Sequence, residues 1–455
     1  MRNVISPLDG TVLASVPVST ATMLDQQLDI AAKAFVELGN QPRYQRITWL
    51  RALHSGLLGD LDGLTIIMAH EIGKPILLAR TELERALTLI DHTIAVLMTE
   101  TGDAPYVDDH PTHAARTVIT KRFPIGIVGA ITPFNFPVNL VFHKILPAIA
   151  TGCPVIVKPS ERTHAIASRL ADLISKSGIP PGAVQFDFAD DGPLHARVLA
   201  SDTRVALLSF TGSDTVGRLL ARDAAGKPQI MELGGSAAVY IGDDADVEIA
   251  AKKCAVGAMA YAGQVCISVQ RVYVHRGVFN VFRDALIAEV TAITALDPRV
   301  DGHILGPMID VNSANRFLEE CKSLDARQLL VAPSVQDGRF VSPCVVTGLP
   351  DSHPLIQQEA FAPVVVLQPV DDLSEAISQM NATPYGLQNG VFTHRIADAL
   401  LAHRQLRGGA VYVNDVPTVR IDKLSYGGDG ASGMGREGIS DVIEAYTTPR
   451  HLVLS

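Results

Sequence analysis

The sequence predicts an α/β protein whose strands form parallel sheets, in a chain long enough for two or more domains. Of its 455 residues, 47% are hydrophobic and 19% are charged, which is ample for a large core. Apolar segments of strand length alternate with helical patterns between residues 121 and 217, as in βαβ units. The same alternation resumes after residue 266, which indicates a second α/β unit, and we place the boundary near Leu233.

The first hundred residues are predicted to be mainly helical. A turn at residues 6–10 precedes a short strand at residues 11–18. From residue 20 to about residue 101, apolar residues recur at intervals of three and four, which is the pattern of amphipathic helices. Glycine and proline in residues 39–42 and 73–75 separate these helices, and we expect the helices to pack without a chemical role.

The strands of the first unit are predicted where apolar residues run together. Residues 121–131 are mostly apolar, as expected for a parallel strand that is buried on both faces. A helix is predicted at residues 165–177. Strands are expected at residues 114–120, 121–131, 154–157, 184–186 and 204–210.

The second unit shows the same signals. Helices are predicted at residues 278–296 and 315–321. The chain is rich in glycine from residue 427 to residue 438, and a last strand is predicted at residues 451–454. The other strands are expected at residues 272–274, 340–346, 364–367, 389–392 and 409–414.

The charge and the cysteines exclude several kinds of function. The net charge of −10 argues against a nucleic-acid partner, which requires a basic face. The five cysteines are scattered and lack the spacing of a zinc site or a disulfide framework, so we expect no metal and a reducing cytoplasm. The first residues lack the apolar core of a signal peptide. The longest apolar stretch, residues 145–157, is interrupted and too short to span a bilayer, so no membrane partner is expected.

Cys266 and Glu232 are the candidate catalytic pair. Each has glycine close by in the sequence and apolar residues around it. A thiol acts as a nucleophile and a nearby carboxylate as a general base. We interpret Cys266 as the group that attacks a carbonyl carbon and Glu232 as the group that activates the water that releases the product. Taken alone, each residue has a more common interpretation: a cysteine packed as a small hydrophobic residue, and a glutamate on a solvated face.

Four further candidates follow the predicted strands of the first unit, where a parallel sheet binds its ligands. Lys158 and Glu161 follow one strand, and Gly212 and Ser213 follow another. A glycine at a strand-to-helix turn lets backbone amides approach a pyrophosphate at the helix N-terminus. The GxGxxG dinucleotide fingerprint and the phosphate loop of nucleotide hydrolases are both absent. The alternatives remain a turn for Gly212 and a helix-start carboxylate for Glu161.

Three residues are candidates for a substrate pocket. His143 follows Asn135 by about two helical turns, and it either lines the pocket or is a hydrogen-bonded core histidine. Arg420 either binds a carboxylate or phosphate of the substrate or forms an ion pair at the surface or between domains. Phe136, next to Asn135, is the third candidate, and Asn135 itself is either a turn residue or part of the site.

Seven segments, in this order along the chain, resemble the motifs of the aldehyde dehydrogenase superfamily, and the resemblance covers essentially the whole chain. They are Pro133-Phe134-Asn135-Phe136-Pro137, Lys158-Pro159-Ser160-Glu161, Phe210-Thr211-Gly212-Ser213, Glu232-Leu233-Gly234-Gly235, Gly263-Gln264-Val265-Cys266, Glu359-Ala360-Phe361-Ala362-Pro363 and Gly433-Met434-Gly435-Arg436-Glu437. The spacing between Glu232 and Cys266 is also the usual one for that family.

The resemblance implies a Rossmann-like cofactor domain, an α/β catalytic domain and a small β oligomerisation domain. We expect the cofactor domain to comprise residues 1–108 and 123–232, and the catalytic domain residues 233–415. The oligomerisation segments would then be residues 109–122 and 416–455, and a homodimer or homotetramer is expected.

The resemblance also implies roles for individual residues. The side-chain amide of Asn135 and the backbone N–H of Cys266 would hold the oxyanion, and such donors are worth about 3 kcal/mol each. Lys158 and Glu161 would hold the adenosine ribose, and Ser213 would contact the pyrophosphate. Lys144 matches a further polar position near the site. The nicotinamide ribose and ring would be positioned by Glu359 and Phe361.

These implications predict the oxidation of an aldehyde to the free acid through a cysteine thioester. Glu232 favours hydrolysis, because branches that transfer the acyl group to coenzyme A generally lack this base. Glu161 favours NAD over NADP, because a carboxylate accepts hydrogen bonds from ribose hydroxyls and repels a 2′-phosphate. Residues 139–144 and 263–271 look most like the lactaldehyde and glyceraldehyde-phosphate branch, so we expect a small, polar aldehyde. The rival hypotheses are an acyltransferase that uses coenzyme A and a non-catalytic structural relative.

Overall fold

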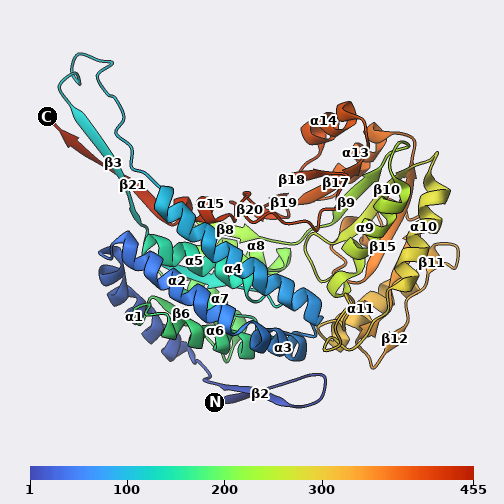
Figure 1. Ribbon diagram of the computed structural model, residues 1–455, viewed down its shortest axis with the longest axis horizontal. Helices are drawn as coiled ribbons and strands as arrows, with labels where there is room; N and C mark the ends of the chain where they lie inside the picture. The colour runs from blue at the N-terminus through green and yellow to red at the C-terminus, as the bar shows by residue number, and fades with distance from the viewer.

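The computed structural model describes residues 1–455 and consists of two α/β units, a two-stranded arm and an N-terminal hairpin (Figure 1). Each unit contains one sheet whose central strands are parallel. The predicted α/β class is therefore confirmed. The strand Gln229–Glu232 of the first sheet and the strand Ala237–Ile241 of the second are separated by the loop 233–236.

The first sheet has six strands in the order β20-β8-β7-β4-β5-β6. All neighbours are parallel except β20, which runs antiparallel to β8. Because the strands are parallel, their carboxyl ends lie at one edge, where ligands bind in such sheets. The strands are β4 (Ile127–Ile131), β5 (Val155–Lys158), β6 (Val184–Phe186), β7 (Val205–Thr211), β8 (Gln229–Glu232) and β20 (Gly433–Met434).

Helices cover both faces of this sheet (Figure 1). Among them, α5 is the most deeply placed: every residue except Leu140 is buried, because α5 packs against α2, α4 and α15 as well as the sheet. The predicted helical region 20–101 forms four helices, and Gly73 ends the third in a left-handed conformation (φ 67°). The helices are α1 (Ala21–Gly39), α2 (Arg43–Gly59), α3 (Leu61–Ile72), α4 (Ile76–Thr99), α5 (Asn139–Thr151), α6 (His164–Lys176), α7 (Gly192–Ser201), α8 (Asp214–Asp223) and α15 (Ile439–Ala445).

The second sheet has seven strands in the order β11-β14-β15-β10-β9-β17-β18. Only β11 is antiparallel to its neighbour. The strands are β9 (Ala237–Ile241), β10 (Val269–His275), β11 (Leu329–Val331), β14 (Cys344–Thr347), β15 (Val364–Val370), β17 (Gln388–Phe392) and β18 (Ala410–Val413). The helices of this unit are α9 (Val247–Met259), α10 (Phe279–Ala292), α11 (Val311–Lys322), α12 (Pro354–Gln357), α13 (Leu373–Asn381) and α14 (Ile396–Gln405).

The strand predicted at residues 340–346 is divided in two. Its first part is β13 (Phe340–Val341), which pairs with β12 (Val335–Gln336) in a separate hairpin. Its second part begins β14 of the large sheet. Pro343 lies between them, and a proline cannot donate a hydrogen bond to a ladder, which accounts for the break.

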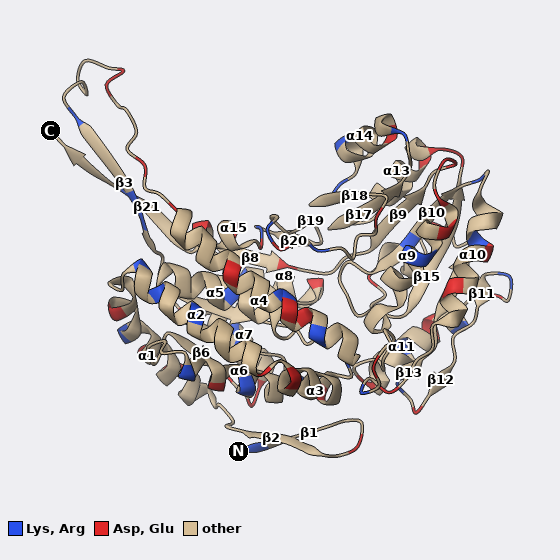
Figure 2. Cartoon of the chain, viewed as in Figure 1, with Lys and Arg blue, Asp and Glu red and all other residues tan.

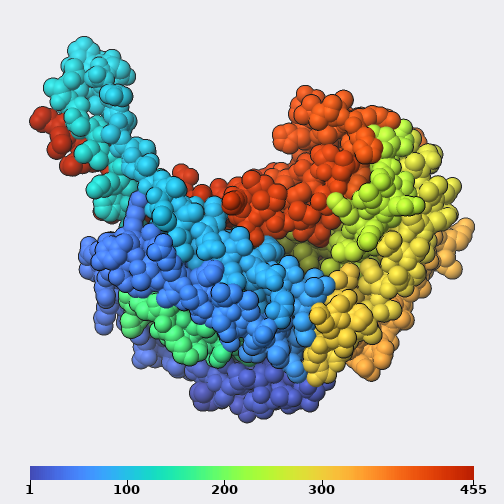
Figure 3. Space-filling model, in the orientation of Figure 1, coloured from blue at the N-terminus to red at the C-terminus, as the bar shows by residue number.

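The arm consists of β3 (Thr117–Pro124) and β21 (Thr447–Leu454), which pair antiparallel and project from the body (Figure 1). The predicted oligomerisation segment 416–455 is thus divided, since only its last strand lies in the arm. Its earlier part returns to the body, where β19 (Asp429–Gly430) pairs with β16 (Tyr385–Gly386) and β20 pairs with β8. The surface between the arm and the second unit is broadly concave (Figure 3).

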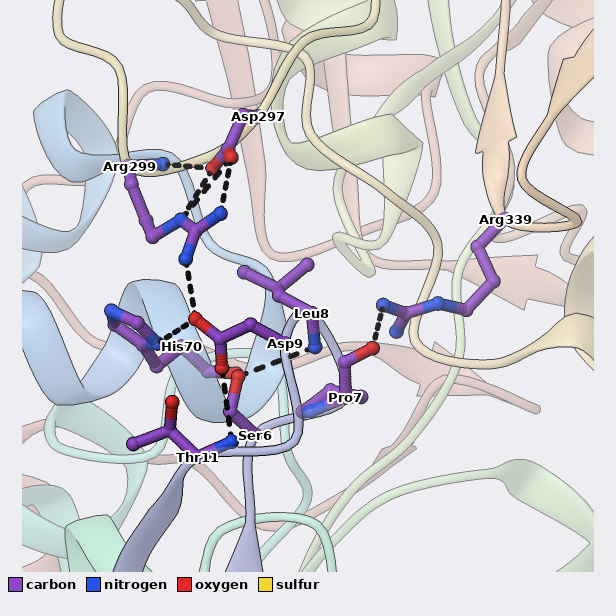
Figure 4. A network of polar contacts seen from close by, with 9 residues as sticks. All are labelled: Ser6, Pro7, Leu8, Asp9, Thr11, His70, Asp297, Arg299 and Arg339. Atoms are coloured by element: carbon purple, nitrogen blue, oxygen red, sulfur yellow. Dashed lines mark hydrogen bonds and ion pairs between the residues drawn. The ribbon is translucent and has the colours of Figure 1, made fainter.

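The N-terminal hairpin, β1 (Arg2–Ile5) and β2 (Val12–Val16), connects the two units through its turn (Figure 4). The Asp9 carboxylate lies 3.7 Å from Nδ1 of His70 in α3 and 2.5 Å from Nη1 of Arg299 in the second unit. Arg339, also in the second unit, donates a hydrogen bond to the Pro7 carbonyl (3.2 Å). The backbone N–H and side chain of Thr11 hold the pKa of Asp9 down at about 2, so this carboxylate is charged at neutral pH.

Acidic and basic side chains are interspersed over both units (Figure 2). None of the helices combines the length and the apolar character that crossing a membrane requires.

Candidate active site

A cavity of about 830 Å³ lies between the two units. It is lined by the carboxyl ends of β7 and β8, by the loop after β4 and by the loop before β10. Lys158 and Glu161 are not among its lining residues. The other predicted site residues all line it: Asn135, Phe136, His143, Gly212, Ser213, Glu232, Cys266, Glu359, Phe361 and Arg420.

Cys266 is presented by a strained loop. The loop begins with the single 3₁₀ turn η1 (Ala260–Gly263), in which Tyr261 and Ala262 have φ values of 53° and 55°. Such backbone is costly for residues with a side chain and persists only where the surroundings impose it. The backbone approaches other segments closely at two places near this loop. A Cβ atom at Gly263 would collide with the carbonyl of Ala362. A Cβ atom at Gly235 would likewise collide with the carbonyl of Cys266, so glycine brings the loop after Glu232 against the cysteine.

The Cys266 thiol is partly buried, whereas the other four cysteines are buried. Its sulfur lies 3.2 Å from the hydroxyl oxygen of Tyr426. Burial raises the pKa of Cys266 to about 12, the carboxylates of Glu359 and Glu232 act in the same direction, and the hydrogen bond with Tyr426 opposes them. Cys266 therefore needs stabilisation of its thiolate in order to react, since the thiolate is the nucleophile.

Asn135 lies in the loop that joins β4 to α5. One side-chain N–H donates to the carbonyl of Gln264 (2.9 Å), and its side-chain oxygen accepts from the backbone N–H of Phe136 (3.1 Å). A primary amide has two N–H groups, so one remains for a substrate oxygen. The amide is therefore oriented by the residues just before Cys266 and keeps one free donor.

The buried ion pair of Lys74 and Glu82 holds the loop that contains Asn135. Nζ of Lys74 lies 2.5 Å from Glu82 and donates to the backbone carbonyl of Asn135 (2.8 Å). The other carboxylate oxygen of Glu82 accepts the backbone N–H groups of Val138 and Asn139 (2.9 and 3.0 Å). Lys74 lies in the turn for which only a separating role was predicted, and Glu82 was not predicted at all. No sequence signal pointed to either, because the contact with Asn135 spans 61 positions.

Glu232 ends β8 and faces the cavity with both carboxylate oxygens buried and without a hydrogen-bond partner. Burial raises its pKa well above the ordinary value, and the carboxylate of Glu437 raises it further, while Lys144 opposes them. Both oxygens are therefore available to accept hydrogen bonds from a water molecule. A raised pKa also suits a carboxylate to take up a proton near neutral pH.

Lys144 and Glu437 form a second buried ion pair beside Glu232. Nζ of Lys144 lies 2.7 Å from Glu437 and donates to the hydroxyl of Thr211 (2.9 Å). Burial alone raises the pKa of Glu437, but the positive charge of Lys144 outweighs it and leaves that pKa below the ordinary value. Glu437 therefore places a negative charge beside Glu232, which raises the proton affinity of the Glu232 carboxylate.

The predicted cofactor residues lie along the carboxyl edge of the first sheet. Lys158 and Glu161 form an ion pair (2.8 Å) against Gly192, the first residue of α7, where a Cβ atom would collide with the Glu161 carboxylate. Ser213 is the N-cap of α8, and its hydroxyl accepts the N–H of Val216 (3.4 Å). The N-terminus of a helix favours an anion, so the edge beside Ser213 suits a pyrophosphate.

Glu359 and Phe361 enter the cavity from the second unit. The Glu359 carboxylate accepts the backbone N–H of Gly235 (3.0 Å), and burial raises its pKa to about 7. The Phe361 ring meets Phe134 edge to face, with 6.0 Å between ring centroids. A Cβ atom at Gly234 would lie 2.7 Å from Glu359, so the lack of a side chain at Gly234 leaves room for the Glu359 carboxylate. Glycine, a carboxylate and an aromatic ring together fit a nucleotide with a flat terminal ring.

The substrate candidates meet at Asp422. Arg85 of α4 binds this carboxylate through Nε and Nη2 (3.1 and 2.9 Å), while Arg420 and His143 each lie 3.8 Å from it. Burial alone raises the pKa of Asp422, but its contacts with His143 and Arg85 leave that pKa well below its ordinary value. Arg85, His143 and Arg420 line the cavity, and Arg85 was not predicted. Phe136, the third candidate, lies under Lys74, with 3.7 Å from Nζ to the ring centroid.

Comparison with known proteins identifies relatives over the whole chain. Residues 1–452 match the model of the aldehyde dehydrogenase family. A 3-sulfolactaldehyde dehydrogenase of Priestia aryabhattai is 34% identical over 439 residues, 96% of this chain and 92% of that protein. A lactaldehyde dehydrogenase of Methanococcus aeolicus is 31% identical over 455 residues, 99% of this chain and 96% of that protein. The crystal structure of glyceraldehyde-3-phosphate dehydrogenase GapN from Methanocaldococcus jannaschii, complexed with NADP, superposes with a TM-score of 0.93 at 29% identity and covers 100% of this chain and 98% of its own.

Proposed function

The chain belongs to the aldehyde dehydrogenase family and is an aldehyde oxidoreductase, and we propose that it oxidises a small, polar aldehyde to the free carboxylic acid. The observation that carries this proposal is the meeting of Asn135, Glu232 and Cys266 in one cavity between the two units. A nucleophile, an oxyanion donor and a base in one cavity are the groups that an acyl-enzyme mechanism requires.

Cys266 begins the reaction. Its sulfur forms a bond to the aldehyde carbon, and the electron pair of the carbonyl bond moves to oxygen. The free N–H of the Asn135 side chain and the backbone N–H of Cys266 receive this oxyanion. Glu359 and Phe361 would hold the nicotinamide riboside of NAD or NADP, which would supply the acceptor for the hydride of the aldehyde carbon, and the Cys266 sulfur would then carry the acyl group as a thioester.

Glu232 completes the reaction. Its carboxylate takes a proton from water while the water oxygen adds to the thioester carbon, the carbon–sulfur bond breaks, and the acid leaves. The absence of other hydrogen-bond partners for Glu232 supports this role, because its oxygens are free to orient the water. The same observation favours hydrolysis over transfer to coenzyme A.

For the cofactor, we propose that NAD is preferred. Lys158 and Glu161 would hold the adenosine ribose, Gly212 and Ser213 the pyrophosphate, and Glu359 with Phe361 the nicotinamide riboside. The preference rests on Glu161, whose carboxylate accepts hydrogen bonds from ribose hydroxyls and repels a 2′-phosphate. Glu161→Gln should therefore narrow the ratio of kcat/KM between NAD and NADP, and an unchanged ratio would contradict this part of the proposal.

For the substrate, we propose a short aldehyde with an anionic group at its far end. Arg85 and Arg420 both line the cavity and share the single carboxylate of Asp422, which supports a role for these two guanidinium groups in holding an anion. The sulfonate of 3-sulfolactaldehyde and the phosphate of glyceraldehyde 3-phosphate, named for two relatives, have this chemistry. Lactaldehyde, named for another relative, is hydroxylated and neutral and is the alternative.

The test is an initial-rate panel. Short aldehydes ending in sulfonate, phosphate, carboxylate, hydroxyl or methyl are each supplied with NAD and with NADP, without and with coenzyme A, and Cys266→Ala is the control. We expect reduced cofactor to form without coenzyme A, fastest with an anionic aldehyde, and to vanish in the variant. Turnover only in the presence of coenzyme A would overturn the role of Glu232, and activity of Cys266→Ala would overturn the mechanism.

We also propose that the arm joins copies of the chain into a homodimer or homotetramer. Leu452, Val453 and Leu454 on β21 are about half exposed (56%, 53% and 48%), as are Ile119 and Phe123 on β3 to a lesser degree. Apolar side chains in this density on a projecting strand pair favour burial against another copy. Light scattering of the chain and of a variant with charged residues at positions 452 and 454 tests this, and an unchanged monomeric mass for both would refute it.

A further inference from the structure

We propose that Tyr426 is a further catalytic residue, whose hydroxyl donates a hydrogen bond to the Cys266 sulfur and stabilises the attacking thiolate. The inference rests on the proposed function only in taking Cys266 as the nucleophile. The hydroxyl oxygen lies 3.2 Å from the sulfur, within the range of a hydrogen bond to sulfur. This is the one hydrogen bond that either group makes, so the phenol has no competing partner.

The charges around the sulfur show why such a donor is needed. Cys266 is surrounded by apolar side chains of Ile267, Val265 and Leu387, and the nearest ionisable neighbours that act on it are the carboxylates of Glu359 and Glu232. Burial and the nearby carboxylates both disfavour a negative charge on the Cys266 sulfur. No lysine, arginine or histidine contacts the sulfur, so the imidazole or ammonium that often activates a thiol is missing.

The chemistry of the pair gives the direction of the hydrogen bond. In the neutral state either the thiol or the phenol donates. Once the sulfur has lost its proton it can only accept, so the phenol must donate, and a hydrogen bond to an ionised acceptor is the stronger kind. The thiol proton leaves to water in the cavity. Burial and the nearby Cys266 and Glu232 charges raise the pKa of Tyr426 well above its ordinary value, so the phenol keeps its own proton.

The surroundings of Tyr426 hold its ring in one orientation. The backbone N–H of Glu437 donates to its carbonyl (2.6 Å), and Ile267 and Leu387 pack against the ring. The guanidinium carbon of Arg420 lies 4.7 Å from the ring centroid. A cation over the ring withdraws electron density from the phenol, which makes its O–H a better donor. The hydroxyl is thus directed at the sulfur and polarised toward it.

Tyr426→Phe tests the proposal because it removes one oxygen and keeps the ring. The measurement is the rate of Cys266 alkylation by iodoacetamide in the absence of cofactor, across the rising part of the pH–rate profile. Cys266→Ser provides the blank, and counting alkylated cysteines by mass spectrometry shows whether the four buried thiols stay protected. Tyr240→Phe, a buried tyrosine in the core of the second unit, is the matched control.

We expect Tyr426→Phe to lower the thiolate fraction at a given pH about 10-fold, which is one pKa unit or about 1.4 kcal/mol. The thiolate that remains is more basic and about threefold more nucleophilic, so alkylation should slow about threefold. The acylation rate should fall by a similar factor, while KM for the cofactor stays unchanged. Tyr240→Phe should alter none of these quantities.

A second variant changes the donor in the opposite direction. Replacing Tyr426 with a ring-fluorinated tyrosine makes the phenol more acidic and the hydrogen bond stronger, so alkylation at low pH should rise relative to the wild type. The proposal is overturned if Tyr426→Phe and the wild type alkylate at the same rate at every pH. If Cys266→Ser still oxidises aldehyde, the proposed function fails instead, so the two failures are distinguishable.

Discussion

The buried ion pair between Lys74 and Glu82 should control both the stability of the protein and the position of Asn135. Glu82→Gln keeps an oxygen for the N–H groups of Val138 and Asn139 but removes the charge beside Lys74. Because Lys74 is 1% exposed, its ammonium then has no ionic partner. Removing one member of a buried pair costs about 3–5 kcal/mol, a large part of the 5–15 kcal/mol typical of a whole domain.

The double variant Lys74→Met/Glu82→Gln separates stability from catalysis. Replacing both charges removes the uncompensated ammonium, so most of the lost stability should return, and the double-mutant cycle should show a coupling of about 2–4 kcal/mol. The hydrogen bond from Lys74 to the Asn135 carbonyl does not return, so the oxyanion donor stays misplaced. We expect kcat to remain about 10-fold below the wild type, with KM nearly unchanged.

The assay is urea unfolding followed by fluorescence, with aldehyde oxidation measured on the same samples. The matched control is the exposed pair of Arg80 and Asp62 (2.7 Å), which joins α4 to α3 on the solvent side. Arg80→Gln should leave both the unfolding midpoint and kcat unchanged. The reasoning is refuted if Glu82→Gln shifts the midpoint no more than Arg80→Gln does, or if the double variant recovers full activity.

Three further predictions concern the base, the substrate pocket and the hairpin turn. Glu232→Gln should still form the thioester and release one equivalent of reduced cofactor in a burst, followed by turnover slowed about 10²–10⁴-fold; a steady rate equal to the wild type would contradict the role of this base. Arg85→Gln should raise KM about 10-fold or more for an anionic aldehyde but not for a neutral one of equal length, and an equal change for both would exclude an anion site. The pKa of Asp9 is about 2 in the folded protein, below its unfolded value of about 3.9, so its stabilisation is present above pH 4 and is lost as pH falls toward 2. Asp9→Asn should therefore lower the thermal midpoint at pH 7, with a difference that narrows between about pH 4 and pH 2; a constant difference would rule out this cause.

The sequence predicted the fold class and the family, and both are confirmed. It also singled out Cys266, Glu232 and Asn135, which the structure places around one cavity. These residues could be found because each lies in a short stretch of motif residues, and the glycines at 235 and 263, which permit close approach, stand beside Glu232 and Cys266. The division of the strand at residues 340–346 was missed because apolar residues stand on both sides of Ser342 and Pro343.

The residues that hold the reacting groups in place leave no such mark. Tyr426 touches Cys266 from 160 positions away, and Arg85 reaches Asp422 across 337. A tyrosine before a glycine-rich stretch and an arginine within a helical pattern look like ordinary surface or core residues, because only the tertiary structure brings their partners to them. A glycine that permits a close approach is visible in the sequence of its own loop. A residue such as Tyr426 or Arg85 cannot be recognised in this way, because the partner that it positions lies in a distant segment of the chain. Slower alkylation of Cys266 in Tyr426→Phe would thus show that the reactivity of the thiol depends on a contact that cannot be predicted from the residues around Cys266.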